Sequence, residues 1–235
     1  MAPEIKFCGL TRAEDVREAV ALGASYVGVI FAGGPRNLTP ARAREVLGEV
    51  PGRVRRVGVF GDQSPEEIAT AAFEASLSVV QLHGASDPMR ISRIRDQFTG
   101  EVWPVLRVAG AELPPEAAEL AYAGDGLLLD ALVAGGLGGT GVTLPWDALS
   151  AAIARLRSGV KIVLAGGLRA ENVAQAIGAL DPDVVDVSSG VEQPGSPGVK
   201  DHQRMRAFRD AVESVSAEFR AKARSAEARN NQSPR

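Results

Sequence analysis

Short apolar segments rich in β-branched residues recur along this chain, and a helical pattern follows each of them. Continuous apolar strands that alternate with helices are typical of a parallel sheet covered by those helices. Eight such units in 235 residues favour a single (β/α)8 TIM barrel of the α/β class over an open doubly wound sheet. The expected strands are Ile5–Cys8, Tyr26–Phe31, Arg53–Phe60, Ser78–Leu82, Val102–Val108, Gly126–Asp130, Val160–Leu164 and Val184–Val187.

Residue types that stabilise helix N-termini precede several helical segments. Thr39 and Pro40 fit the N-cap and the first helical position. Thr11 and Ser64 are each followed three residues later by a glutamate, which is the spacing of a capping box. Pro104 is unfavourable inside a central strand. The later helices are expected at Ser86–Phe98, Leu113–Ala121, Trp146–Leu156, Arg169–Leu180 and Lys200–Val215.

We expect one catalytic barrel domain over residues 1–215, followed by an extension over residues 216–235 that is a frayed helix or disordered. Hydrophobic residues make up 45% of the chain but aromatic residues only 5%, so the core must consist mainly of Ala, Val, Leu and Ile. A net charge of −3 gives no indication of nucleic-acid or membrane binding. A single cysteine, Cys8, and no apolar segment of signal-peptide or membrane-spanning length lead us to expect a cytoplasmic protein.

Two strand ends within residues 160–192 consist of small residues. Small residues let backbone N–H groups face a ligand, and the start of a helix adds a partial positive charge. Adjacent strand ends of this kind, late in a chain of strand–helix units, are typical of the phosphate site of a (β/α)8 barrel. We therefore expect phosphate binding at Gly166, Gly167, Ser189 and Gly190.

Polar side chains end several expected strands, where the active face of a barrel enzyme forms. Residues two apart on a strand point the same way, so these side chains are placed to converge on one opening. The candidates are Lys6, Cys8, Gln81, His83, Arg107, Asp130, Asp186 and Ser188, with Arg36 in the loop after the second strand. Among them, we expect substrate binding by Arg36, Gln81, His83 and Asp186.

Each candidate also has a structural explanation. Cys8, judged by position alone, fits a small buried hydrophobic residue as well as a functional one. Asp130 ends an apolar strand, where an unpaired acid is costly, so function is favoured there. Lys6 fits an ion-pair partner for an acid such as Asp186 better than it fits a catalyst. For His83 the structural alternative is a hydrogen-bonded strand-end histidine, and for Arg36 it is a solvated loop residue.

Nine short segments, taken together, match the pattern of one family. They are Lys6–Thr11, Gly34–Arg36, Val57–Phe60, Gln81–Gly84, Leu127–Asp130, Gly138–Gly141, Leu164–Val173, Asp186–Glu192 and Gly198–Asp201. A glycine pair or Ser-Ser-Gly is weak alone, but the segments run in family order over about residues 4–212 at matching spacings. The chain therefore resembles the phosphoribosylanthranilate isomerases of tryptophan biosynthesis.

The resemblance implies conversion of N-(5′-phosphoribosyl)anthranilate to 1-(2-carboxyphenylamino)-1-deoxyribulose 5-phosphate, an Amadori rearrangement. It implies that Cys8 is the general base and Asp130 the general acid. It also implies that Arg36 meets the anthranilate carboxylate and that Gly139 lies in a loop covering the substrate. The residues implied in phosphate binding are Gly166, Gly167, Ser189 and Gly190.

The residue chemistry fits this reaction. Ring opening requires a proton at the ring oxygen, which suits Asp130, and a Cys8 thiolate is able to remove the C2′ proton. No redox step occurs, so no cofactor is expected, and no metal is expected because His83 and His202 lack partners at ligand spacing. We expect a small phosphosugar substrate and a monomer or homodimer. The alternatives are a dual-substrate or histidine-pathway aminoaldose–aminoketose isomerase and a non-catalytic phosphosugar-binding barrel.

Overall fold

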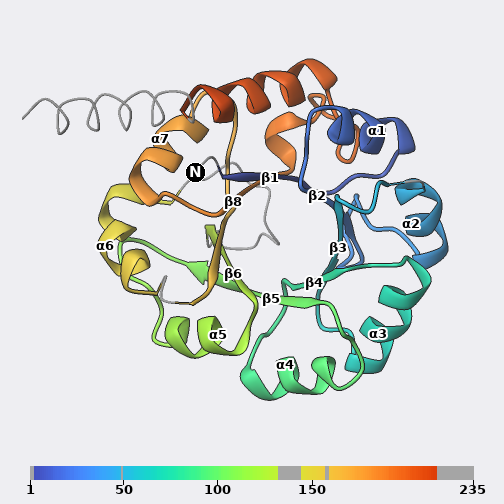
Figure 1. Ribbon diagram of the computed structural model, residues 1–235, viewed down its shortest axis with the longest axis horizontal. Coiled ribbons are helices and arrows are strands. Elements are labelled where there is room, and N and C mark those ends of the chain that lie inside the picture. Colours follow the sequence, from blue (N-terminus) through green and yellow to red (C-terminus); the bar gives the residue numbers. More distant parts are fainter. Residues whose placement is uncertain (1–2, 49, 132–143, 157–158, 216–235) are drawn as a thin grey trace, which may run out of the picture.

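The computed structural model describes residues 3–48, 50–131, 144–156 and 159–215. Its strands are β1 (Glu4–Phe7), β2 (Tyr26–Ile30), β3 (Arg55–Phe60), β4 (Val79–Leu82), β5 (Glu101–Val108), β6 (Gly126–Ala131), β7 (Lys161–Leu164) and β8 (Val184–Val187). They form a closed barrel in sequence order, and β8 pairs in parallel with β1 to complete the ring (Figure 1). The expected TIM barrel is confirmed, with strand ends that differ from the expected ones by up to two residues.

Helices surround the barrel (Figure 1). They are α1 (Ala13–Ala21), α2 (Pro40–Leu47), α3 (Pro65–Glu74), α4 (Pro88–Arg95), α5 (Ala117–Ala123), α6 (Trp146–Leu156), α7 (Val173–Leu180), the short 3₁₀ helix η1 (Ser189–Val191) and a C-terminal helix over residues 202–215. The expected extension over residues 216–235 lies outside the described residues. Aliphatic side chains from the strands and helices form the core between the two layers, as the composition predicts.

Two of the three expected helix caps are confirmed. The Thr39 and Ser64 side chains each accept a hydrogen bond from the backbone N–H three residues later, and Ser64 has both halves of a capping box. The Thr11 capping box is wrong. Helix α1 begins after Arg12 without a side-chain cap, because the Thr11 hydroxyl donates to the carbonyl oxygen of Gly198 at 2.6 Å. A tertiary contact has therefore replaced the local cap.

Four helices begin later in the chain than the sequence pattern predicts. Asp87 caps α4 by accepting from the backbone three residues on, so that α4 begins at Pro88. Asn172 closes a turn before α7 by accepting from the backbone N–H of Arg169 at 2.8 Å. The C-terminal helix begins at residue 202, because the N–H of Lys200 donates to the buried carboxylate of Asp15 in α1. Helix α5 begins four residues after its expected start, and only α6 matches its expected bounds among these later helices.

Pro104 lies inside β5, despite the missing N–H group. The ladder between β5 and β6 starts one residue later, at Val105. Gly124 lies beside the proline, and a Cβ there would be 2.5 Å from Pro104 Cδ. The proline ring therefore occupies space that a side chain at position 124 would fill.

Charged and aromatic side chains close the N-terminal end of the barrel. Lys161 Nζ donates to the Tyr26 hydroxyl at 2.8 Å and lies 5.4 Å and 5.5 Å from the ring centroids of Tyr26 and Trp103. The Tyr26 hydroxyl donates to Glu4 at 3.0 Å, and Trp103 Nε1 donates to Glu101 at 2.8 Å. The polar atoms of both rings therefore have partners, and this end of the barrel is a structural plug.

Replacing Tyr26 with Phe should lower the free energy of unfolding by about 1–2 kcal/mol, because Lys161 loses its hydroxyl acceptor while the ring stays in place. The matched control is Tyr122→Phe on α5, where the side chain is 95% exposed. Urea denaturation followed by circular dichroism measures both variants. Equal midpoints for the two would show that the hydroxyl contributes nothing to the plug.

Candidate active site

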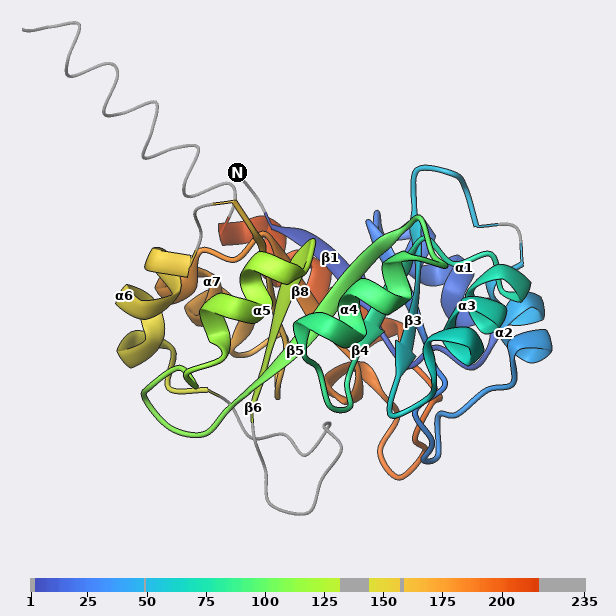
Figure 2. The ribbon, with the colours of Figure 1, turned by 90° about the horizontal axis from the view of Figure 1, so that it is seen from below.

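The loops at the opposite end of the barrel enclose a cavity of about 280 Å³. In Figure 2 the loops that follow β2 and β8 reach the side away from the N-terminus. The predicted site residues that line this cavity are Cys8, Arg36, Gln81, His83, Asp130, Gly166, Gly167, Asp186, Ser189 and Gly190. The structure thus brings together the predicted catalytic and substrate-binding residues except Gly139, which lies outside the described residues, whereas the candidates Lys6 and Arg107 do not line the cavity.

A buried ion pair lies at the floor of this cavity. Lys6 Nζ donates to Asp186 Oδ2 at 2.6 Å and to Gln81 Oε1 at 2.9 Å. Burial by itself would lower the pKa of Lys6, but the attraction of Asp186 and Cys8 outweighs it and raises that pKa above its ordinary value. Lys6 is therefore a cation, and its predicted pairing with Asp186 is confirmed.

Cys8 follows β1 directly, and its N–H donates to the carbonyl oxygen of Val187 at 2.9 Å. Gly28 in β2 leaves room for the thiol, since a Cβ there would be 3.0 Å from Cys8 Sγ. Burial raises the pKa of the Cys8 thiol, and the charges of Lys6 and Lys200 oppose this rise without cancelling it. Cys8 is a protonated thiol at neutral pH that has cations beside it to stabilise the thiolate.

Asp130 in β6 lines the cavity from another wall. Strands β7 and β8 separate β6 from β1 in the ring, and the Asp130 residue is only 6% exposed. Asp130 Oδ2 lies 3.8 Å from His83 Nε2. The carbonyl oxygen of His83 accepts from Arg107 Nη2 at 3.0 Å, which fixes the end of β4. An acid and a thiol therefore face one cavity from separate strands.

Two glycine-containing strand ends meet on one side of the cavity. Gly166 and Gly167 have φ angles of +85° and +63°, which favour glycine. A Cβ at Gly190 would lie 2.0 Å from the carbonyl oxygen of Leu168, so the segment after β8 packs directly on the segment after β7. Asn172 Nδ2 donates to the carbonyl oxygen of Gly167 at 3.0 Å and holds this turn. Such a close backbone approach is suited to an anion cradle built from N–H groups.

Arg36 reaches the cavity from the loop after β2, and Glu192 binds its guanidinium. Arg36 Nε and Nη2 donate to the two carboxylate oxygens of Glu192, each at 2.7 Å. Glu192 Oε1 also accepts from Lys200 Nζ and from the N–H of Gly198, each at 3.0 Å. Burial would raise the pKa of Glu192, but these donors lower it to about 2. Glu192 is therefore ionised at neutral pH.

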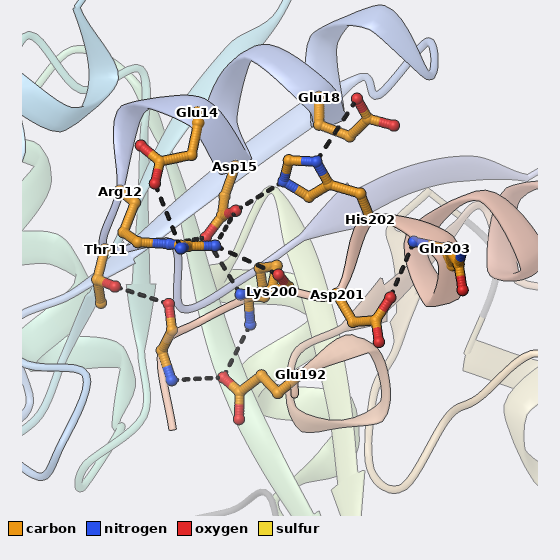
Figure 3. Close-up of polar contacts among 11 residues, drawn as sticks. Thr11, Arg12, Glu14, Asp15, Glu18, Glu192, Lys200, Asp201, His202 and Gln203 are labelled. Atoms are coloured by element: carbon orange, nitrogen blue, oxygen red, sulfur yellow. Dashed lines mark hydrogen bonds and ion pairs between the residues drawn. The ribbon is translucent and has the colours of Figure 1, made fainter. Parts of the chain in front are cut away.

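The segment that carries Glu192 and Lys200 is tied to α1 through Asp15 (Figure 3). The N–H of Lys200 donates to Asp15 Oδ2 at 3.1 Å. Arg12 binds the same carboxylate through Nε and Nη2, at 2.9 Å and 2.7 Å. His202 Nε2 lies 2.9 Å from Asp15 Oδ1. Buried Asp15 thus fixes this segment against the start of α1.

Sequence reasoning gave no role to Glu192, Lys200 or Gly9, although all three belong to the segments that carry the family resemblance. The pairing of Arg36 with Glu192 joins residues 156 positions apart, so no local spacing indicates it. Gly9 has a φ of +66°, and a Cβ there would be 2.8 Å from Arg36 Cδ. The sequence signal for this approach is only the glycine itself, directly after Cys8.

In the ranges that the structure describes, no group of three or more His, Cys, Asp and Glu side chains is arranged to hold a metal ion. Within the same ranges, no helix has both the length and the apolar character needed to cross a membrane.

Known proteins resemble this chain over most of its length. Residues 5–211 match the family model for N-(5′-phosphoribosyl)anthranilate (PRA) isomerase. The N-(5′-phosphoribosyl)anthranilate isomerase of Acidithiobacillus ferrooxidans is 42% identical over 205 residues, which cover 87% of this chain and 94% of that protein. The crystal structure of phosphoribosyl anthranilate isomerase from Thermotoga maritima aligns with a TM-score of 0.80 at 33% identity, over 90% of this chain and 99% of that one.

A second solved structure of phosphoribosyl anthranilate isomerase is a complex with reduced 1-(o-carboxyphenylamino)-1-deoxyribulose 5-phosphate. It aligns with a TM-score of 0.77 at 32% identity, again over 90% of this chain and 99% of that one. The family model and the curated relative each cover more than four fifths of the chain. The chain therefore belongs to the N-(5′-phosphoribosyl)anthranilate isomerase family.

Proposed function

We propose that this chain converts N-(5′-phosphoribosyl)anthranilate to 1-(2-carboxyphenylamino)-1-deoxyribulose 5-phosphate by an acid/base Amadori rearrangement in tryptophan biosynthesis. Membership of the isomerase family supports the reaction. The observation that carries the assignment of residues is the single cavity into which Cys8 and Asp130 project beside a glycine cradle. One relative was solved in complex with reduced 1-(o-carboxyphenylamino)-1-deoxyribulose 5-phosphate, a ligand that has both a carboxyphenyl and a phosphate group.

Asp130 acts as the general acid and Cys8 as the general base. Asp130 protonates the ring oxygen, the bond from this oxygen to C1′ breaks, and the nitrogen lone pair forms a Schiff base. The Schiff base acidifies the C2′ proton, which Cys8 removes as a thiolate to give an enolamine. O2′ then loses a proton and C1′ gains one, which yields the aminoketose. Substrate and product are isomers, so no redox partner takes part.

The two ends of the substrate carry negative charge, and each has a matching group in the cavity. The backbone around Gly166, Gly167, Ser189 and Gly190 binds the phosphate, since turned-out N–H groups suit an anion. Arg36 binds the anthranilate carboxylate, for which a planar guanidinium has the matching geometry. Gln81, His83 and Asp186 line the cavity between these two ends and contact the sugar.

Turnover assays with the aminoaldose of the tryptophan pathway and the aminoaldose of the histidine pathway test the proposal. Turnover of the anthranilate substrate alone is expected. Turnover of both would make the chain a dual-substrate isomerase, and turnover of neither would leave a phosphosugar-binding barrel. Complementation of a tryptophan auxotroph that lacks this isomerase, scored beside a histidine auxotroph, checks the same point in cells. A cytoplasmic location and a monomeric or homodimeric state stay predictions.

The variants Asp130→Asn and Cys8→Ala should each lower kcat at least about 10²-fold, the usual loss when a positioned acid or base is removed. The matched control is Asp62→Asn, in the loop after β3, where the side chain is 85% exposed. Steady-state kinetics with the anthranilate substrate measure all three. A kcat near that of the wild type in either site variant would contradict the role given to that residue.

Titration of Cys8 should show a pKa above the ordinary thiol value in the folded protein, because burial disfavours the thiolate. The thiolate fraction at any pH near neutrality is then smaller than in the unfolded chain, and it rises only as the pH passes the folded-state pKa. Ultraviolet thiolate absorbance, taken as the difference between the wild type and Cys8→Ala so that tyrosine ionisation cancels, reports this titration, since Cys8 is the only cysteine. The same chain in urea is the control, and a folded-state pKa below the urea value would refute the prediction.

A further inference from the structure

Arg36 depends on tertiary contacts for its position. It follows Gly33 and Gly34, which have φ angles of +86° and +79°, so it is carried by a loop and not by a helix or strand. A free arginine side chain has about 2 kcal/mol of rotamer entropy, which a ligand must overcome if the chain is not already fixed. An arginine that recognises a carboxylate from this loop therefore gains affinity if another residue fixes it first.

Glu192 makes the contacts that fix this side chain. Its carboxylate takes Arg36 Nε and Nη2 in a two-point hydrogen bond, and it is itself 6% exposed. This geometry orients the guanidinium plane and leaves Nη1 and the second Nη2 hydrogen as donors for a ligand. Gly9 lets the aliphatic part of Arg36 lie against the backbone, because a Cβ at position 9 would be 2.8 Å from Arg36 Cδ. Arg36 lines the cavity, and Glu192 is not one of the lining residues in the described chain.

A carboxylate beside Arg36 would by itself weaken the attraction of a substrate anion, and Lys200 offsets this effect. Lys200 is buried, and its ammonium donates to Glu192 Oε1 and to the carbonyl oxygen of Ser188, each at 3.0 Å. Burial lowers the pKa of Lys200, and the attraction of Glu192 opposes that shift. With Lys200 protonated, Arg36, Glu192 and Lys200 together carry one net positive charge, so the guanidinium is held in place and still attracts an anion.

We propose that Glu192 is a positioning residue that sets the preference for a substrate bearing a carboxylate on its aromatic ring, by holding Arg36 in its binding orientation. The inference rests on the proposed function, because it takes Arg36 as the partner of the anthranilate carboxylate. It concerns recognition and leaves the proton transfers to Cys8 and Asp130. Glu192 therefore affects the KM for a carboxylated substrate and not the chemical step.

The test compares two substrates in wild-type enzyme and in Glu192→Gln. One is N-(5′-phosphoribosyl)anthranilate and the other is N-(5′-phosphoribosyl)aniline, which lacks the carboxylate. In the variant, KM for the anthranilate substrate should rise about tenfold with kcat within about threefold, as expected when one charge-assisted hydrogen bond is weakened. The kcat/KM for the aniline substrate should stay close to wild type, so the preference for the carboxylated substrate falls by the same factor.

Two controls separate positioning from a general loss of structure. Glu18→Gln removes a partly buried glutamate that pairs with Arg206 at 2.8 Å away from the cavity, and it should leave the substrate preference unchanged. In an Arg36→Ala background, Glu192→Gln should have no further effect on KM, because its partner is gone. Thermal unfolding of each variant verifies the fold. If Glu192→Gln does not fold, Glu192→Asp keeps the charge on a shorter side chain and should lower the preference for the carboxylated substrate, by less than about tenfold.

An unchanged substrate preference in folded Glu192→Gln or Glu192→Asp would overturn the inference. So would an equal rise in KM for both substrates, or a full effect of Glu192→Gln in the Arg36→Ala background, since these outcomes indicate a structural role only. A wild-type chain that turns over neither substrate would instead refute the proposed function. The two failures are therefore distinguished by the wild-type assay.

Discussion

The pairing of β8 with β1 places Lys6 directly beside Asp186, and the ion pair between them is the interaction on which the site depends. Loss of one partner from a buried ion pair typically costs about 3–5 kcal/mol, because the other charge is left uncompensated. The two residues come from the first and last strands, so the pair forms only when the barrel closes. Cys8 lies two residues beyond Lys6, and the base of the proposed reaction is therefore positioned by closure of the fold.

The buried cations near Cys8 act against the effect of burial on the thiol. Burial keeps the thiol protonated, whereas Lys6 and Lys200 favour the thiolate that proton abstraction requires. Each lysine is itself paired with an acid, Asp186 or Glu192, which limits the cost of desolvation. The site thus contains cations that stabilise a developing negative charge without an unpaired charge at either lysine. This arrangement depends on two acids that perform no proton transfer in the proposed mechanism.

The barrel and most of the cavity were predictable, because strand periodicity and strand-end residue types are local properties of the sequence. Cys8 and Asp130 were found this way, since each ends an apolar strand. The partners of Arg36 and of Thr11 were not predictable, because Glu192 and Gly198 lie in a segment more than 150 residues away. The predicted starts of α4 and α7 were wrong for a related reason. The side chains of Asp87 and Asn172 accept hydrogen bonds from the backbone and form turns where the first helical residues were expected.

The segment after β8 links the two ends of the proposed substrate site. Gly190 packs on the carbonyl oxygen of Leu168 in the phosphate cradle, and Glu192, two residues later, binds Arg36. A single short segment therefore fixes the separation between the proposed phosphate and carboxylate sites. The acid lies in β6 and the base directly follows β1, both outside this segment. Recognition and proton transfer are consequently carried by different parts of the barrel, so substitutions that retune which aromatic amine is accepted need not disturb the chemistry.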